Sequence, residues 1–215
     1  MIFVKNFKII IMKNLRVIKT IALLILIIGT FSCKKETTPD PEPNPQLETG
    51  TVTDLNGNTY QTVKIGNQWW MAENLRATST SDETSVSGVY VYNNSESYLA
   101  TYGRLYTWDA AKKPFISGWH LPSEAEWGVL ASTLGSDVAA KLKVGGSSGF
   151  EAKFGGYRTY TGQYVEMGSW VGFWTSTVYT SDHSYIRYLF ASNNNFTDHE
   201  GCGNTGGNSV RLIKD

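Results

Sequence analysis

The chain has 215 residues, two cysteines, and 19 basic against 19 acidic residues, so its formal net charge is zero. Because the basic residues are scattered rather than clustered, the composition argues against a nucleic-acid partner. Every tryptophan and tyrosine lies after residue 46, and this part of the chain is long enough to bury a substantial core.

The first 32 residues have the order of a bacterial secretory signal. Basic residues precede an apolar run at 21–28, a short stretch of mostly small residues follows, and then comes Cys33. A cysteine at the cleavage point predicts a lipoprotein signal, with Cys33 as the lipidated first residue of the mature chain. Translation starts at Met1 or at Met12, which gives a signal of more usual length. The alternative is an uncleaved anchor helix, although crossing a bilayer takes roughly 20 apolar residues.

In either case we expect an exported protein that is held to a membrane, with the outer membrane as the predicted location on its periplasmic or outer face. Residues 33–46 hold four of the six prolines, which predicts a disordered, semi-rigid spacer. Residues 47–215 contain no second linker and are expected to form one domain. With Cys33 lipidated, only Cys202 remains, so we expect no disulfide inside this domain.

Two tight turns divide residues 51–71 into three expected strands. Asn56-Gly57 is a strong hairpin signal because both residues tolerate positive φ, and Gly66-Asn67 gives a second turn. After them, a surface loop rich in Ser, Thr and Asn is expected over residues 77–97, around a short strand at 89–92.

Two helices are expected in the middle of the domain, over residues 105–112 and 123–134. The second has the stronger signals, because the Ser123 side chain can cap the helix while the Glu126 carboxylate reaches back to the cap, forming a capping box. Gly135 is expected to end it. Its apolar face would be formed by Trp127, Leu130, Ala131 and Leu134.

The last part of the domain consists of short aromatic segments separated by glycines. Strands are expected at 155–158, 164–166, 172–177, 185–191 and 209–213. The Asn- and Gly-rich stretch 192–208 is expected to be a loop. Strands first, helices in the middle and strands at the end predict an α+β fold with an antiparallel sheet.

Several segments are similar to a known family. Residues 54–60, 64–75, 103–108, 118–127, 155–158, 173–177 and 209–215 resemble, in order, the Fibrobacter succinogenes major paralogous domain, which is common in lipoproteins of Bacteroidetes-type bacteria. Segments 121–127 and 173–177 also resemble formylglycine-generating proteins. The resemblance implies a C-type-lectin-like fold, in which two helices flank small antiparallel sheets. It implies no particular activity.

The enzyme interpretation is disfavoured by the cysteines. Formylglycine-generating enzymes use a metal-binding cysteine pair near the end of the chain, whereas here only Cys202 is available and Leu212 stands where many relatives carry cysteine. One thiol cannot supply both ligands for a soft metal. No Ser-His-Asp or Cys-His order stands out, and three histidines in separate contexts do not indicate a catalytic triad. We therefore expect a protein that is not an enzyme and needs no cofactor.

A metal site is a less favoured alternative. The residues that could converge are Asp182, His183, Asp198, His199, Glu200 and Cys202, whose types suit zinc. They lack a fixed ligand spacing, so we favour solvated loop residues. C-type lectins bind calcium through a Glu-Pro-Asn or Gln-Pro-Asp triplet, which is missing from the domain. Glu42-Pro43-Asn44 has this sequence but lies in the spacer, where no fixed coordination shell can form.

The polar residues of the family-like motifs have a structural and a functional interpretation. They are Glu73, Asn74, Arg104, Glu126 and Arg158. We favour the structural one, in which they form ion pairs and hydrogen bonds that support a core rich in loops.

The candidate ligand-binding residues lie near the end of the chain. They are Tyr179, Tyr185, Tyr188, Asn193, Asn194, Asn195 and Phe196, since aromatic faces pack on sugars and amides offer paired donors and acceptors. Ordinary strand packing plus a solvated turn is the competing interpretation. The leading hypothesis is a lipid-anchored envelope protein with a non-catalytic module that binds a polysaccharide or another envelope protein. The runner-up is a structural component of an outer-membrane complex without a soluble ligand.

Overall fold

The structure is a computed structural model that describes residues 47–215, with the backbone alone at residues 198–200. The described residues belong to one compact unit, Gln46–Asp215. The predicted signal and spacer, including the predicted lipidation site Cys33, lie outside the described residues.

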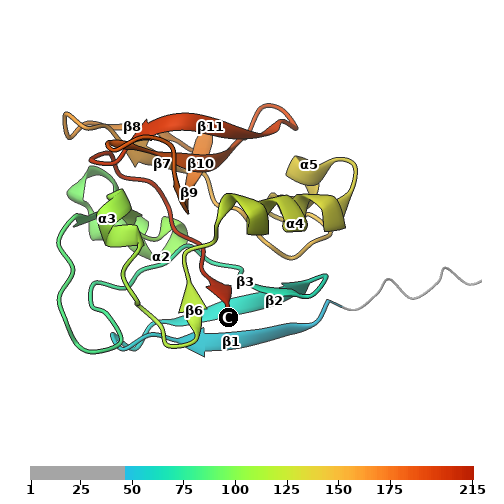
Figure 1. Cartoon of the computed structure of the whole chain (residues 1–215), viewed down its shortest axis with the longest axis horizontal. Coiled ribbons are helices and arrows are strands. Elements are labelled where there is room, and N and C mark those ends of the chain that lie inside the picture. Colours follow the sequence, from blue (N-terminus) through green and yellow to red (C-terminus); the bar gives the residue numbers. More distant parts are fainter. Residues whose placement is uncertain (1–46) are drawn as a thin grey trace, which may run out of the picture. The chain divides into compact units, whose positions relative to one another are not determined.

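The first sheet joins strands from both ends of the domain (Figure 1). In spatial order its strands are β1 (Thr49–Thr53), β2 (Thr59–Ile65), β3 (Gln68–Met71), β12 (Ile213–Lys214) and β6 (Trp119–His120). The predicted three-stranded start is confirmed, because β1 pairs with β2 and β2 with β3 in antiparallel register. Ile213 pairs with Trp70 on one side and with His120 on the other. A segment from the end of the chain therefore lies inside a sheet that the start of the domain begins.

The second sheet is built from the last third of the chain. Its spatial order is β8 (Tyr164–Met167), β7 (Gly155–Arg158), β9 (Trp170–Val178), β10 (His183–Phe190) and β11 (Phe196–Gly203). The expectation of purely antiparallel sheets is wrong at one place, because β7 pairs with β9 in parallel through Gly156 and Val171. The expected loop 192–208 is also wrong in part. It contains β11, whose polar sequence is held in the sheet by its pairing with β10.

The helices are short except for α4 (Glu124–Leu134), whose predicted capping box is present. Gly135 follows α4 with a φ of 69°, and the next helix is α5 (Val138–Leu142). The helix expected over 105–112 is wrong at its start. The smaller elements of this region are β4 (Val89–Tyr90), α2 (Leu99–Tyr102), β5 (Leu105–Tyr106) and α3 (Trp108–Ala111). No helix within residues 47–215 is long and apolar enough to cross a membrane.

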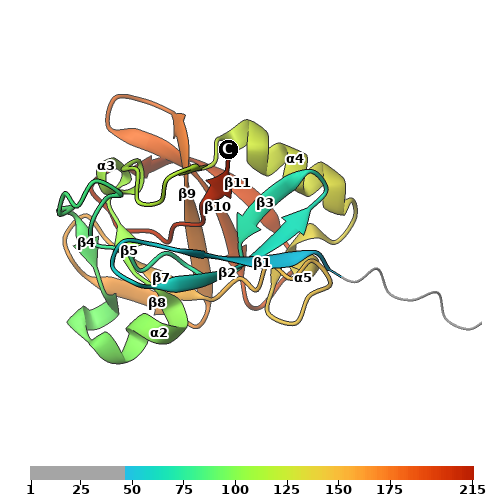
Figure 2. The ribbon, with the colours of Figure 1, turned by 90° about the horizontal axis from the view of Figure 1, so that it is seen from below.

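The start of α3 is displaced because strand pairing uses the first two residues of the expected helix. Leu105 and Tyr106 pair with β4, and the Thr107 side chain then caps α3 by accepting a hydrogen bond from the Ala110 N–H. The overall class, α+β with small sheets, is confirmed. Figure 2 shows the same arrangement from below, with α4 beside β3.

Aromatic side chains pack together where α4 lies against both sheets. The ring centroids of Trp127 on α4 are 4.6 Å from Trp70 on β3 and 5.6 Å from Phe173 on β9. Phe150 closes the group at 5.7 Å from Trp127, and all four side chains are fully buried. One contiguous aromatic core thus fixes the second sheet against the first.

Arg211 lies against this core although it carries a charge. Its guanidinium is fully buried and lies 4.6 Å from the ring centroid of Phe150. It donates hydrogen bonds to Asn74 Oδ1 at 2.7 Å and to the carbonyl oxygens of Met71, Phe150 and Glu151 at 2.7–2.9 Å. Burial lowers the pKa of Arg211 to about 9, so it remains protonated at neutral pH.

Candidate functional site

The candidate site is on the second sheet, where aromatic residues occupy paired positions of β9 and β10. Trp170 pairs with Phe190, and Gly172 pairs with Tyr188. Residues two apart on a strand share a face, so Tyr188 and Phe190 project from the same side of β10. The rings of Trp170 and Tyr188 stack with centroids 6.1 Å apart and planes 23° apart. Tyr157 from β7 meets Trp170 edge-on at 4.9 Å.

Gly172 allows the Trp170 ring to lie across β9. A β-carbon at Gly172 would be 2.2 Å from Trp170 Cη2 and 3.0 Å from Asn208 Oδ1. At 2.2 Å the β-carbon would collide with the indole ring, which would have to shift. At 3.0 Å it would also crowd the amide oxygen. The missing side chain at residue 172 therefore positions both the indole ring and the amide, as expected where a glycine permits close approach in a strand.

These side chains surround a pocket of about 380 Å³, which we call the aromatic pocket. Its lining residues are Tyr157, Glu166, Trp170, Ile186, Tyr188, Phe190, Cys202 and Asn208. The volume lies in the lower part of the roughly 300–1,000 Å³ range that is typical of small-molecule sites. The walls are flat rings, so the pocket suits a ligand that has a flat apolar face.

Asn208 supplies the aromatic pocket with a buried amide. It is 1% exposed, and its backbone exchanges two hydrogen bonds with Tyr106, which fixes its position. Its Nδ2 donates to Cys202 Sγ at 3.3 Å, whereas its Oδ1 has no partner among the described residues. Buried acceptors are normally paired, because an unpaired one loses its bond to water without replacement. The Asn208 Oδ1 atom is itself buried and lies close to Gly172, so this amide forms part of the pocket wall.

The other polar groups of the aromatic pocket do not form an acid–base pair. Burial raises the pKa of the Cys202 thiol, and the hydrogen bond from Asn208 offsets this only in part. A neutral thiol is a weak nucleophile. Glu166 is the charged residue of the described lining, and its carboxylate accepts a hydrogen bond from the Ser169 hydroxyl. The partners of these two groups are Asn208 and Ser169, so within the described lining no hydrogen bond joins the thiol to the carboxylate.

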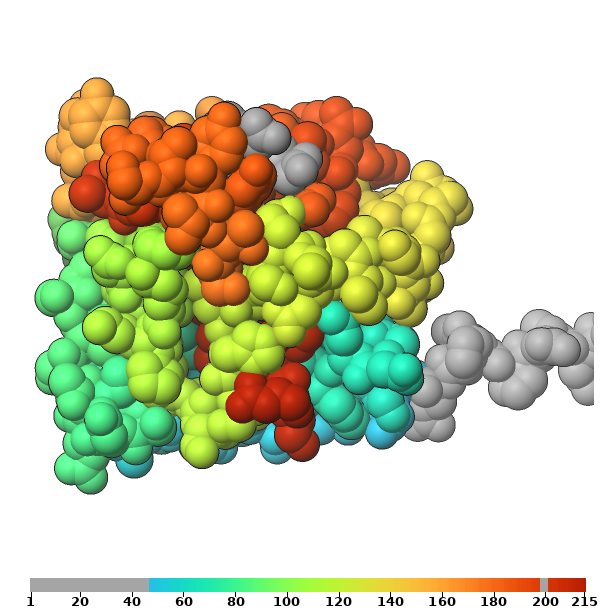
Figure 3. Space-filling model, in the orientation of Figure 1, coloured from blue at the N-terminus to red at the C-terminus, as the bar shows by residue number. Residues whose placement is uncertain are grey.

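The predicted ligand-binding tyrosines do not lie together. Tyr188 lines the aromatic pocket. Tyr179 and Tyr185 instead pack edge-on against each other at 5.4 Å, near the turn between β9 and β10, and line no described pocket. Figure 3 shows the β9–β10 region in orange against the yellow-green region that contains β6 and α4.

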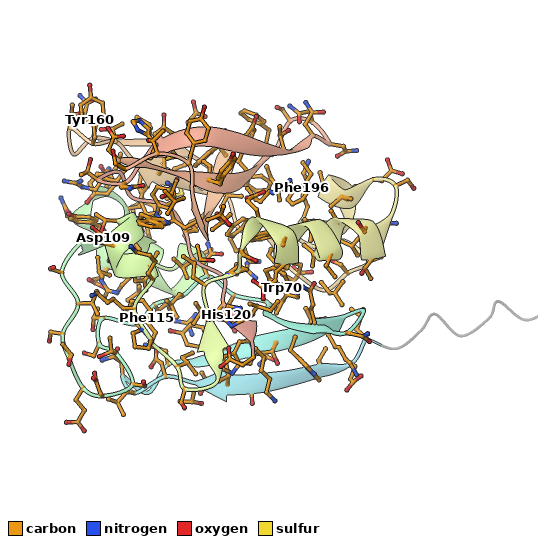
Figure 4. The ribbon with its side chains drawn as sticks, viewed as in Figure 1. Trp70, Asp109, Phe115, His120, Tyr160 and Phe196 are labelled. Carbon is orange, nitrogen blue, oxygen red and sulfur yellow. The ribbon has the colours of Figure 1, made fainter. Side chains whose placement is uncertain are left out.

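The predicted asparagines and Phe196 lie at the other end of β10. The Lys143 ammonium group donates to the carbonyl oxygen of Asn193 at 2.5 Å and to Asn194 Oδ1 at 3.3 Å. Asn195 N–H donates to the side chain of Asn193, so the turn is internally bonded. Phe196 lies between β11 and α4 (Figure 4), with its ring 6.0 Å from Trp127. Phe196 pairs with Leu189, the neighbour of Tyr188, so its side chain lies on the opposite face of the sheet from Tyr188, against the core, while the asparagines lie in the turn before it.

The predicted metal ligands fall on the hairpin of β10 and β11 and on the residue before it. They are Asp182, His183, Asp198, His199, Glu200 and Cys202. Asp182 and His183 form a pair, with Oδ1 and Nδ1 2.9 Å apart. The side chains of residues 198–200 lie outside the description. Among the side chains that are described, no group of three His, Cys, Asp or Glu residues could hold a metal ion.

The polar residues of the family-like motifs have internal partners in the structure. Asn74 is buried and bonds to Arg211 and the Tyr102 carbonyl, and Glu73 bonds to Arg76 and the Gln61 N–H. The remaining three also have partners. Arg104 Nε donates to the Arg76 carbonyl, Arg158 stacks 4.1 Å above the Tyr90 ring, and the Glu126 carboxylate bonds to Ser123 and His120.

His120 uses both ring nitrogens in a polar cluster at the start of α4. Its Nδ1 lies 2.5 Å from Asp215 Oδ1, and its Nε2 lies 2.8 Å from Glu126 Oε1. Burial disfavours the charged imidazolium, but the hydrogen bonds to Asp215 and Glu126 outweigh it and raise the pKa of His120. The cluster joins β6, α4 and residue 215, so it has a structural role.

Sequence reasoning missed most of the aromatic pocket. Tyr157, Trp170, Phe190 and Asn208 were not among the predicted ligand-binding residues. Two signals were available in the sequence. Tyr188 and Phe190 are two residues apart, and Trp170 has a glycine two residues away on each side. The parallel pairing of β7 with β9, which brings Tyr157 to the site, has no local signal.

The fold and the pocket define a small α+β domain with an aromatic pocket on its second sheet. Residues 63–214 match the family model of the Fibrobacter succinogenes major domain. The chain therefore belongs to this family, as its motifs predicted. No curated protein and no solved structure matches it.

Proposed function

We propose that the protein is a cell-envelope lipoprotein, anchored through Cys33, whose domain is a non-catalytic carbohydrate-binding module with a C-type-lectin-like fold. The lipoprotein assignment is supported by the order of basic, apolar and small residues before Cys33. The fold assignment is supported by the family and by the α+β architecture with small sheets. The observation that carries the binding function is the aromatic pocket, in which the stacked rings of Trp170 and Tyr188 lie beside the Glu166 carboxylate.

The pocket matches the two kinds of surface that a sugar ring presents. The apolar C–H face of a pyranose packs on an aromatic ring, and the stacked pair Trp170 and Tyr188 offers such a face. The sugar's hydroxyl groups need acceptors, and the Glu166 carboxylate in the lining provides them. Carbohydrate binding at this pocket is expected to be independent of calcium. Calcium takes six to eight oxygen ligands, whereas the described lining contains a single carboxylate, that of Glu166.

The first test is binding of residues 46–215, which form one compact unit, to an array of polysaccharides and glycans with and without EDTA. We expect binding that EDTA leaves unchanged and that Tyr188→Ala weakens at least about 10-fold, because one wall of the pocket is lost. Gly172→Ala is expected to weaken it as well, because a methyl group there displaces the Trp170 ring.

The matched control is Tyr185→Ala, which removes the same side chain from the same strand but outside the described lining of the pocket. Equal losses for Tyr185→Ala and Tyr188→Ala would contradict the assignment of the site. Silence across the whole array would reject carbohydrate as the ligand and would favour an envelope protein, to be sought by crosslinking on intact cells.

A further inference from the structure

A second pocket adjoins the aromatic pocket. It has a volume of about 260 Å³, and we call it the outer pocket. The two pockets share Tyr157, Cys202 and Asn208 as lining residues. The two pockets therefore adjoin each other, and together we call them the groove.

The outer pocket also has an aromatic side chain at its rim. Tyr160 lies in the turn between β7 and β8 (Figure 4), lines this pocket and is 80% exposed. The turn around it is well ordered by hydrogen bonds. Thr159 N–H donates to the Gln163 carbonyl at 2.8 Å, and Gly162 N–H donates to the Thr159 carbonyl at 3.0 Å. Tyr160 is thus presented from a backbone that is fixed by the turn, so little backbone entropy is lost when a ligand packs on its ring.

The size and charge of the groove restrict what can occupy it. Each compartment lies near or below the lower end of the volumes found for small-molecule sites, so each fits a small unit. The charged residues in the two linings are Glu166 in the aromatic pocket and Arg158 in the outer pocket, one of each sign. This balance favours an uncharged ligand over a polyanion or a polycation.

From these observations we infer that the groove binds a neutral linear oligosaccharide of at least two linked sugar rings, with one ring on Trp170 and Tyr188 and the next on Tyr160. This inference rests on the proposed carbohydrate-binding function and adds the length and charge of the ligand.

The test is a titration of residues 46–215 with neutral homo-oligomers of one to six units, prepared from β-1,4-glucan, β-1,4-mannan, β-1,4-xylan and β-1,4-galactan. For the series that binds, we expect affinity to rise from one unit to at least two. Tyr160→Ala is expected to weaken the tetramer roughly 3- to 10-fold and to leave the monomer within about 2-fold. Tyr188→Ala is expected to weaken both.

Tyr160→Ala is a clean probe because the ring is mostly exposed, and Tyr179→Ala, at 46% exposure outside both pockets, is its control. Equal affinity for monomer and tetramer, with no effect of Tyr160→Ala, would overturn the inference and leave the proposed function standing. Binding confined to uronate polymers or to peptides would also overturn it. Failure of every glycan on the array as well as every oligomer would reject the proposed function itself.

Discussion

Arg211 is a single charged residue that links several segments of the domain by hydrogen bonds. It is fully buried, and its bonds go to one amide and three backbone carbonyl groups rather than to a carboxylate. Peptide oxygens near β3 and in the loop after α5 would otherwise be buried without donors. Arg211 therefore supplies hydrogen-bond donors to backbone carbonyl groups that receive none from secondary structure.

Replacement of Arg211 by methionine is expected to lower the free energy of unfolding by about 3 kcal/mol or more. The apolar stem is kept, but several buried acceptors lose their donor, each at a cost of about 1–3 kcal/mol with partial relaxation. Urea unfolding followed by tryptophan fluorescence measures this. Lys64→Met is the control, because Lys64 pairs with Glu48 on the surface and is expected to matter by under about 1 kcal/mol. Similar losses for the two variants would contradict the role given to Arg211.

At the scale of single elements, the start of α4 combines a helix cap with a titratable cluster. Glu126 closes the capping box with Ser123 and also bonds to His120. Burial opposes its ionisation, but the bonds from the Ser123 N–H and hydroxyl and from His120 lower the pKa of Glu126. The helix cap and the imidazole therefore share one carboxylate.

The stability of the domain is expected to depend on the protonation of His120. Since the folded state raises the pKa of His120, its contribution is complete below the unfolded value of about 6.5 and is lost as pH rises through the folded pKa. The His120 side chain is 42% exposed, so solvent screening limits the effect to under about 1 kcal/mol. The measurement is the difference in unfolding free energy between pH 5.5 and pH 9, for the wild type and for His120→Asn. An identical pH dependence in both proteins would exclude the cluster as its source.

The elements that could be predicted are those that local sequence determines. The capping box and Gly135 gave both ends of α4, and the two glycine turns gave the first three strands. The strand β11 could not be predicted, because its polar residues are held by six paired positions on β10 rather than by their own preference. The same holds for Leu105 and Tyr106, which pair with β4 instead of starting a helix.

The candidate site was harder to predict because several distant segments build it. Tyr188 was predicted from its residue type and its place near the end of the chain. Tyr157 reaches the pocket through the parallel pairing of β7 with β9, and Asn208 reaches it through backbone hydrogen bonds to Tyr106. Phe196 has the same residue type as a stacking group, yet it packs against Trp127 in the core. Residue type and position along the chain do not separate these cases, whereas burial and register do.

For the molecule as a whole, the first sheet depends on a strand that comes last in the chain. β12 lies between β3 and β6, and Ile213 is 2% exposed. Deletion of residues 213–215 is expected to remove at least about 3 kcal/mol of stability, because a buried isoleucine and the pairings on both sides are lost. Circular dichroism during urea unfolding measures the loss.

The control is deletion of residues 47–49, which removes the first residue of the edge strand β1. We expect this deletion to lower the free energy of unfolding much less. If the two deletions were equally damaging, the central position of β12 would not be the reason for its importance.

The late position of β12 also has a consequence for the time at which the domain acquires its structure. While the chain is being synthesised, β3 and β6 have no strand between them, and Arg211 has not yet reached its acceptors. We therefore expect the first sheet to be completed only after residues 211–214 have been made, so that this domain finishes folding after its synthesis rather than during it.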